Sequence, residues 1–230
     1  MYPAKHVVTE ESEFRSLHRD AHISQIGKII DHIDENCRVW IERSPFLTMA
    51  TYDAKGNVDV SPKGDPSGFV RILDEKTLAI PERPGNYRYD GLSNILQTGR
   101  IGLVFLVPNR NEVIRVNGSA RIVRDLDIRE SMAIKGRVPD LAVLVHVEEA
   151  FFHCGKAVLR SGLWSPDKAP NNKDLPTYAQ AVTAQANLPS PVEAVQSLLK
   201  LSLQTHNNET LLTQHSSQLT DHDDNHTLCR

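Results

Sequence analysis

The stretch that most constrains the fold is residues 80–118, IPERPGNYRYDGLSNILQTGRIGLVFLVPNRNEVIRVNG. It predicts a polar loop, a short helix, an apolar strand at Ile101–Val107, a turn and a second strand in direct succession. The loop places Arg83, Asn86 and Arg88 just before the helix. Arginines and the free N–H groups of a helix N-terminus together form an anion site, most often for phosphate. The stretch therefore predicts an anion site on a strand–loop–helix unit.

The short helix in this stretch has recognisable ends and one apolar face. Asp90 can cap it, because a short carboxylate accepts hydrogen bonds from the first N–H groups of a helix. Leu92, Ile95 and Leu96 recur at three- and four-residue steps and form the apolar face. Gly99 ends the helix, since glycine readily adopts the conformation of a helix C-terminus.

Composition excludes several classes of protein. A net charge of -3 over 230 residues gives no bulk attraction to nucleic acid, and 6% aromatic residues argues against a base-stacking surface. Cys37, Cys154 and Cys229 form no CxxC motif, which favours reduced thiols and a cytoplasmic location. No window approaches the ~18 apolar residues of a membrane span, and the N-terminus has no apolar secretion-signal core. The sequence predicts a soluble, intracellular protein with no membrane association.

Most of the chain reads as short antiparallel strands. Residues 46–62 predict a hairpin around a turn at 53–57, where Gly56 can take positive φ. Further strands are expected at 69–73, 77–80, 101–107, 112–124 and 142–154. Turns every ~8–12 residues favour a β-barrel or a sandwich. Too few helices intervene for a doubly wound parallel sheet.

Helices are expected at both ends of this region. Residues 24–43 predict one continuous helix, because apolar residues recur along a single stripe. Shorter helices are expected at 125–135, 177–185 and 192–203. The expected organisation is an N-terminal arm at 1–23, a main domain at 24–188, a C-terminal helix at 189–205 and a disordered tail at 206–230.

Six motifs in chain order carry a resemblance to a known family. They are SPF at 44–46, DVSPKG at 59–64, PERPGN at 81–86, RVNG at 115–118, FHCGKA at 152–157 and RSGLW at 160–164. Over about residues 25–180 the chain resembles the pyridoxamine-phosphate-oxidase-like FMN-binding split-barrel superfamily. It is most similar to a bacterial branch described only as probable FMN-dependent enzymes. The resemblance implies a mainly β (α+β) fold, a split β-barrel of antiparallel Greek-key type with flanking helices.

The resemblance also implies where FMN would bind. In the oxidase, a Ser-Arg-Lys run holds the FMN phosphate, and the matching positions here are Asn86, Tyr87 and Arg88. Arg88 keeps the cationic role, because guanidinium contacts phosphate through two N–H groups. Tyr87 departs from the pattern, so Arg83 is the candidate for the second cation.

Further positions match the flavin side of the family's site. Ser61 and Lys63 fall where the family runs a strand along the isoalloxazine ring. Arg115 lies on a strand that resembles one lining the flavin cleft. Arg160 matches an arginine that reaches the cofactor from the partner subunit, and Trp164 loosely replaces a tryptophan that does the same. The resemblance therefore implies a homodimer with FMN at the interface.

Each of these residues could instead have an ordinary structural role, and both alternatives stay open. Arg88 fits a surface ion pair, Lys63 a solvated turn lysine, and Arg115 a strand residue in an ion pair. For His153 a core position is favoured over a catalytic base, and for Trp164 packing is favoured over flavin stacking. No catalytic residue and no metal site is predicted.

The function implied by the resemblance is an FMN-dependent oxidoreductase that passes hydride or electrons between a small molecule and FMN. NAD(P)H is a candidate electron donor, although no GxGxxG motif follows a strand. Oxidation of vitamin B6 is not expected, because no Arg-x-His follows Arg160. One alternative is a flavin, haem or deazaflavin binding protein of the same fold without turnover. Another is an interaction protein that binds a partner through residues 190–230.

Overall fold

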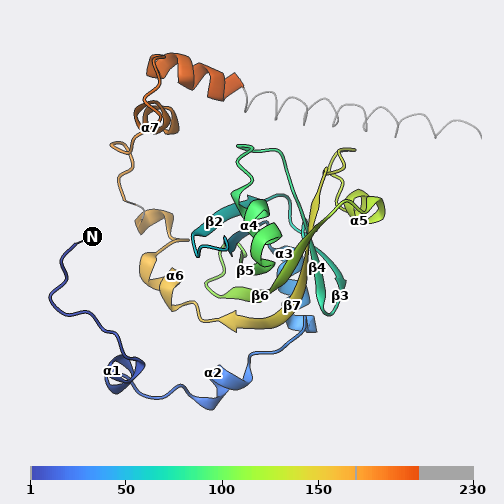
Figure 1. Ribbon diagram of the computed structural model, residues 1–230, viewed down its shortest axis with the longest axis vertical. Coiled ribbons are helices and arrows are strands. Elements are labelled where there is room, and N and C mark those ends of the chain that lie inside the picture. Colours follow the sequence, from blue (N-terminus) through green and yellow to red (C-terminus); the bar gives the residue numbers. More distant parts are fainter. Residues whose placement is uncertain (1, 169, 202–230) are drawn as a thin grey trace, which may run out of the picture. The chain divides into compact units, whose positions relative to one another are not determined.

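The computed structural model describes residues 2–168 and 170–201 (Figure 1). The described chain divides into two compact units. One contains residues up to 133 together with 138–166, and the other contains 134–137 together with the described residues from 167 onward. The domain boundaries expected from the sequence stay a prediction, and the tail expected at 206–230 lies outside the described residues.

The first unit is built on one seven-stranded sheet in the order β2-β1-β5-β6-β7-β4-β3. Every neighbouring pair of strands is antiparallel. The strands are β1 Phe46–Tyr52, β2 Val58–Gly64, β3 Arg71–Asp74, β4 Thr77–Pro81, β5 Arg100–Leu106, β6 Val113–Val123 and β7 Ala142–His153. The sheet is curved but not closed, and several helices flank it (Figure 1). The predicted fold class, a mainly antiparallel split barrel with flanking helices, is confirmed.

Side chains that alternate along the strands form the core. Leu47 and Met49 of β1 and Leu103 and Phe105 of β5 are almost fully buried. Burial of such a side chain contributes ~1.5–3 kcal/mol. Cys37 lies among them, and burial raises the pKa of its thiol to about 12, so it acts as a packing residue.

The predicted single helix at 24–43 is wrong. The structure has two helices there, α2 Ile23–Gly27 and α3 Glu35–Arg43. Between them Ile30 leaves the helix to pair with Ala150, donating its N–H over 3.1 Å and accepting one over 2.7 Å. Asp34 then starts α3, because its carboxylate accepts from the N–H of Cys37 at 2.8 Å. Pairing with the distant β7 overrides the local helical pattern.

A bulge bends the two longest strands. The register of β6 and β7 shifts between Asn117 and Gly118. A Cβ at Gly118 would overlap the carbonyl oxygen of His146, so only glycine fits there. The bulge lets the sheet curve around its core.

The remaining helices are short. In the first unit they are α1 Glu11–Ser16, α4 Asp90–Thr98, α5 Leu126–Ser131 and α6 Lys156–Ser161. In the second unit α7 spans Tyr178–Gln185, and Thr177 and Gln180 form a capping box at its start. Residues 192–201 are also helical. No helix in the described ranges is both long and apolar enough to cross a membrane.

Candidate functional site

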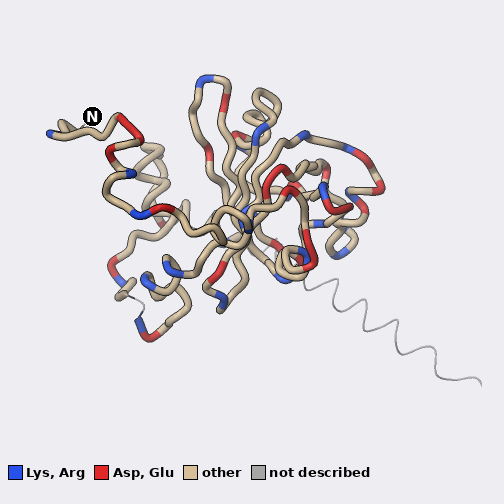
Figure 2. Tube along the Cα trace, turned by 90° about the horizontal axis from the view of Figure 1, so that it is seen from below, with Lys and Arg blue, Asp and Glu red and all other residues tan. Residues whose placement is uncertain are grey.

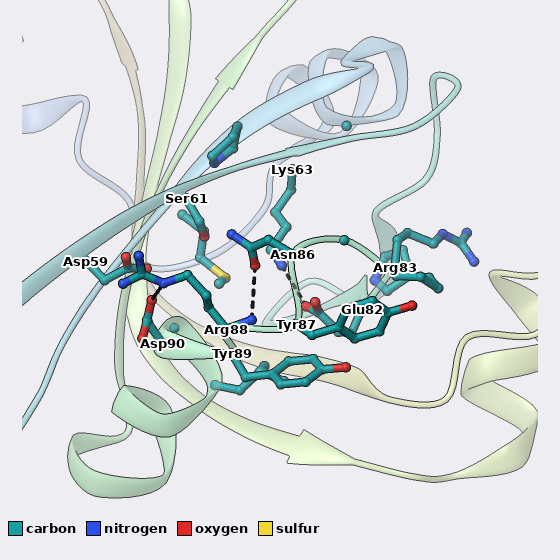
Figure 3. A pocket seen from close by; sticks show the side chains of 18 of the residues that line it. Asp59, Ser61, Lys63, Glu82, Arg83, Asn86, Tyr87, Arg88, Tyr89 and Asp90 are labelled. Carbon is teal, nitrogen blue, oxygen red and sulfur yellow. Dashed lines mark hydrogen bonds and ion pairs between the residues drawn. The ribbon is translucent and has the colours of Figure 1, made fainter. Parts of the chain in front are cut away.

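A cavity of about 360 Å³ lies beside β2 and the N-terminus of α4 (Figure 3). We call it the loop–helix cavity. Its lining comes from β1 and β2, from the loop after β2, from residues 81–89 and from the first turn of α4. Of the site residues predicted from the sequence, it brings together Ser61, Lys63, Arg83, Asn86 and Arg88.

Strand alternation explains why β2 contributes to this cavity. Asp59, Ser61 and Lys63 pair with Thr51, Met49 and Leu47 of β1, which are all buried. Directly opposed residues of an antiparallel pair share one face of the sheet. The three polar side chains therefore point to the core side of the sheet, at its β2 edge, where the cavity opens.

Ser61 contributes a buried polar group to the site. Its hydroxyl oxygen is buried and has no hydrogen-bond partner among the described residues. Leaving such a group unpaired costs about 1–3 kcal/mol. A buried hydroxyl that lines a cavity without a partner is suited to a ligand.

The N-terminus of α4 faces the same cavity without a side-chain cap. Tyr89 holds the N-cap position with φ +57°, and no side chain accepts from the first turn. The predicted cap by Asp90 is therefore wrong: Asp90 lies inside the first turn. The first N–H groups of α4 and the positive end of the helix dipole stay available to an anion.

The packing of α4 brings its backbone close to β1. The side-chain amide of Asn94 donates to Thr51 Oγ1 at 3.1 Å, and a Cβ at Gly91 would lie 2.9 Å from Met49 Cε. Leu92 and Ile95 are buried as expected, but Leu96 is 77% exposed, so the predicted apolar face is one residue too wide. Gly99 ends the helix with φ +63° as predicted.

Arg88 is the most accessible cation of the cavity. Its Nε donates to Asp90 Oδ2 at 2.7 Å, and its side chain is 72% exposed. Exposed ion pairs of this kind contribute only ~0–1 kcal/mol. Its backbone N–H donates to Asn86 Oδ1 at 3.1 Å, which orders the loop before α4. The guanidinium can therefore exchange Asp90 for a ligand at little cost.

Lys63 and Arg83 are held by largely buried carboxylates. Lys63 Nζ lies 2.6 Å from Glu82 Oε2, and Arg83 Nε lies 2.6 Å from Asp65 Oδ2. Arg83 also donates through Nη2 to the carbonyl oxygen of Met132 at 2.7 Å. Their charges are thus compensated, and both side chains serve first to join the walls of the cavity.

The charges of the cavity do not balance. Its lining carries three cations, Lys63, Arg83 and Arg88, and four carboxylates. Three of the carboxylates have the ion-pair partners described above, whereas Asp59 has none among the described residues. In Figure 3 Asp59, Arg88 and Asp90 gather at one end and Arg83 lies at the other. Along the described residues, acidic and basic residues are interspersed (Figure 2).

Two predicted site residues lie outside the cavity. Arg115 projects from β6 over the ring of Phe151 on β7, at 5.1 Å from its centroid. Arg160 lies on α6. His153 is exposed, so the core position favoured for it is wrong, and Trp164 donates to the carbonyl oxygen of Arg110 at 2.7 Å.

Sequence reasoning missed several lining residues, among them Asp59, Glu82, Tyr89 and Gly91. Asp59 could have been found, because it alternates with Ser61 and Lys63 along one strand. The other three depend on how the loop before α4 folds back onto β2.

Comparison with known proteins gives one family match. A model of the family described as pyridoxamine 5'-phosphate oxidase matches residues 33–154. No curated protein sequence matches the chain.

Similar solved structures cover about half of the chain. HupZ of Group A Streptococcus is 29% identical, over 52% of this chain and 93% of its own, with a TM-score of 0.42. A candidate pyridoxamine 5'-phosphate oxidase from Lactobacillus delbrueckii is 25% identical, over 53% and 95%, with a TM-score of 0.42. An FMN-binding protein from Syntrophomonas wolfei is 12% identical, over 51% and 88%, with a TM-score of 0.38. Since these TM-scores lie below 0.5, only the family match bears on function.

Proposed function

This chain belongs to the pyridoxamine 5'-phosphate oxidase family, and from that premise we propose that it binds FMN in the loop–helix cavity and acts as an FMN-dependent oxidoreductase on a small molecule. One observation carries the proposal. The unpartnered, buried hydroxyl of Ser61 lies in the same cavity as the uncapped N-terminus of α4. An acceptor-rich, anionic ligand would satisfy both. The volume also falls within the ~300–1,000 Å³ usual for small-ligand sites.

At the phosphate end of the ligand, Arg88 and the first turn of α4 would hold the phosphate. The helix N-terminus offers N–H donors, and the guanidinium can contact two oxygens at once. The Oδ1 of Asn86 accepts from the backbone N–H of Arg88, and this contact leaves the side-chain NH₂ to donate to the ligand. Arg83 is a weaker candidate for the second cation, since Asp65 and the Met132 carbonyl already occupy two of its N–H donors.

Along β2, Ser61 and Lys63 would contact the ring system. The Ser61 hydroxyl can donate to a ring acceptor and accept from a ring N–H. The ammonium of Lys63 can donate to a ring acceptor, but its ion pair with Glu82 reduces the positive field that it adds. When bound, FMN supplies the two-electron chemistry that amino-acid side chains lack, and the protein supplies position and field.

The proposal includes a homodimer with FMN at the interface and a cytoplasmic location. Supporting it, Val58 and Val60 of β2 are 72% and 61% exposed on the sheet face that points away from the core. Arg115 and Arg160 lie outside their own cavity, as residues that serve a partner's cavity would. Apolar side chains on an exposed strand are typical of a surface that a second copy covers.

A second candidate is binding of a flavin, haem or deazaflavin without turnover. For a flavin or deazaflavin it is favoured by the absence of histidine and cysteine from the residues that line the cavity, whereas haem would lack its usual histidine or cysteine ligand there. The site thus offers no imidazole or thiol for proton transfer or nucleophilic attack.

The test is the absorption spectrum of the purified protein, with the bound cofactor released and identified by mass. A flavin spectrum with FMN released supports the proposal, and a colourless protein that takes up no added FMN overturns it. Reduction of the bound FMN by NAD(P)H and reoxidation by oxygen would separate the oxidoreductase from the binding protein. Light scattering at several protein concentrations, with Val60→Glu as the variant, tests the dimer.

A further inference from the structure

We propose that Tyr87 and Tyr89 form an aromatic wall of the loop–helix cavity that stacks on the planar ring of the bound ligand. The inference rests on the proposed function, in which that ring is the isoalloxazine of FMN. Stacking would set the preference for a planar aromatic ligand, whereas Arg88 and α4 would set the preference for its phosphate.

The backbone of both tyrosines is unusual. Tyr87 has φ +58° and Tyr89 has φ +57°, in the left-handed region that bulky residues rarely adopt. Glycine would adopt the same conformation without strain. Strained positions of this kind persist where the surroundings hold them, and they gather at ligand sites. Here Asn86 accepts from Arg88 between the two tyrosines, and Tyr89 O accepts from Ser93 N at 2.9 Å.

This backbone brings the two rings together at the cavity. Their centroids lie 6.2 Å apart with an interplanar angle of 73°, an edge-to-face pair. Both residues line the cavity, and in Figure 3 both rings extend in the same direction, away from Asp59 and Asp90. The pair therefore presents an aromatic corner beside Arg88 and the first turn of α4, where the phosphate would bind.

Packing within the protein does not account for these side chains. Tyr87 is 68% exposed and Tyr89 is 45% exposed, and neither hydroxyl has a hydrogen bond among the described residues. Two strained, exposed tyrosines contribute little to folding in the described part of the chain. A planar ligand would bury them and gain ring–ring contact, which is favourable in offset or edge-to-face geometry.

The experiment separates strain from binding. Tyr87 and Tyr89 are each changed to Gly, Leu and Phe, and the full chain is titrated with FMN and with riboflavin. Glycine should leave the melting temperature of the ligand-free protein unchanged or raise it, because it relieves the left-handed strain. Glycine and leucine should both weaken FMN and riboflavin binding about tenfold, whereas phenylalanine should bind nearly as wild type.

Asn109→Gly is the matched control. Asn109 also has φ +62°, but it lies in the turn after β5 and does not line the cavity. Like the tyrosine-to-glycine variants, Asn109→Gly should be at least as stable as wild type. It should bind FMN and riboflavin with wild-type affinity. If wild type binds both ligands and the glycine and leucine variants bind them as tightly as wild type does, this inference alone fails. It also fails if phenylalanine weakens binding as much as leucine. If wild type binds neither ligand, both this inference and the proposed function fail.

Discussion

The ammonium of Lys63 on β2 lies 2.6 Å from the carboxylate of Glu82, which follows directly after β4. β2 and β4 are not neighbours in the sheet, so this pair joins the β2 edge, across the cavity, to the strand that lies next to the opposite edge. Both side chains are largely buried, so removal of one partner leaves the other charge poorly solvated.

We expect Glu82→Gln to lower the free energy of unfolding at neutral pH by about 2–3 kcal/mol. Urea unfolding monitored by circular dichroism measures the change. The double variant Lys63→Met, Glu82→Leu is the control, and it should lose less stability than Glu82→Gln alone because no unpaired charge remains. Equal stability of Glu82→Gln and wild type would contradict a stabilising role for the pair.

Arg88→Ala should weaken FMN binding about ten- to hundredfold, because a hydrogen bond to a charged group contributes ~1.5–3 kcal/mol. Riboflavin, which lacks the phosphate, should bind equally well to both proteins. Arg124→Ala, at an exposed position outside the cavity, is the matched control and should leave FMN binding unchanged. A similar loss for riboflavin would show that Arg88 acts on the loop rather than on the phosphate.

Ser61→Ala should uncouple stability from binding. The ligand-free variant should be as stable as wild type or up to about 1 kcal/mol more stable, because a buried hydroxyl without a partner is removed. Its affinity for FMN should fall roughly threefold to tenfold with the loss of one hydrogen bond.

Ser44→Ala is the control for this prediction, since the buried Ser44 hydroxyl contacts the carbonyl oxygens of Phe46 and Leu106 at 2.7 Å. It should lose about 1–2 kcal/mol of stability and keep its FMN affinity. A destabilised Ser61→Ala protein would mean that this hydroxyl is satisfied in the folded protein.

Gly118→Ala should destabilise the protein by more than about 3 kcal/mol, because the added Cβ overlaps the backbone of β7 at the bulge. Gly102→Ala on β5 is the comparison, since its Cβ would lie 3.4 Å from Asn117 Oδ1, the end of a side chain that can move. Thermal unfolding of both variants measures the difference. Equal melting temperatures would contradict the close approach of β6 and β7.

Asp31 should titrate at unusually low pH. A hydrogen bond from Lys76, 2.7 Å away, lowers the pKa of Asp31 from 3.8 to about 2. Because the pKa is lower in the folded protein, the stabilisation is complete above pH 3.8 and is lost as the pH falls toward 2. Lys76→Met should return the pKa of Asp31 toward 3.8 in a carboxyl titration by NMR. The pKa of Asp53, lowered by Asn57, should stay unchanged and serves as the control.

The sequence was sufficient where local pattern and tertiary environment agree. The aliphatic run at 101–107 and the alternation around residues 46–62 became β5 and the β1–β2 hairpin. Gly99 ended α4 as expected, because its conformation depends on the helix that it terminates. The family resemblance pointed to Ser61, Asn86 and Arg88, and the structure brings these three residues to one cavity.

Local pattern failed where a distant contact competes with it. Residues 24–43 have a helical stripe, yet Ile30 pairs with Ala150 because two backbone hydrogen bonds to β7 outweigh one further helical turn. Asp90 is a good capping residue in isolation, but the left-handed Tyr89 takes the N-cap position.

The antiparallel strands, the turns and the family could be predicted from the sequence, because they follow from the periodicity of side chains and from motifs in a fixed order along the chain. Which charges remain available to a ligand depends instead on the fold. Lys63 and Arg83 look like free cations in the sequence, but folding brings Glu82 and Asp65 to within 2.6 Å of them. The physical reason is that electrostatic compensation depends on distance in space, which the order of residues does not contain.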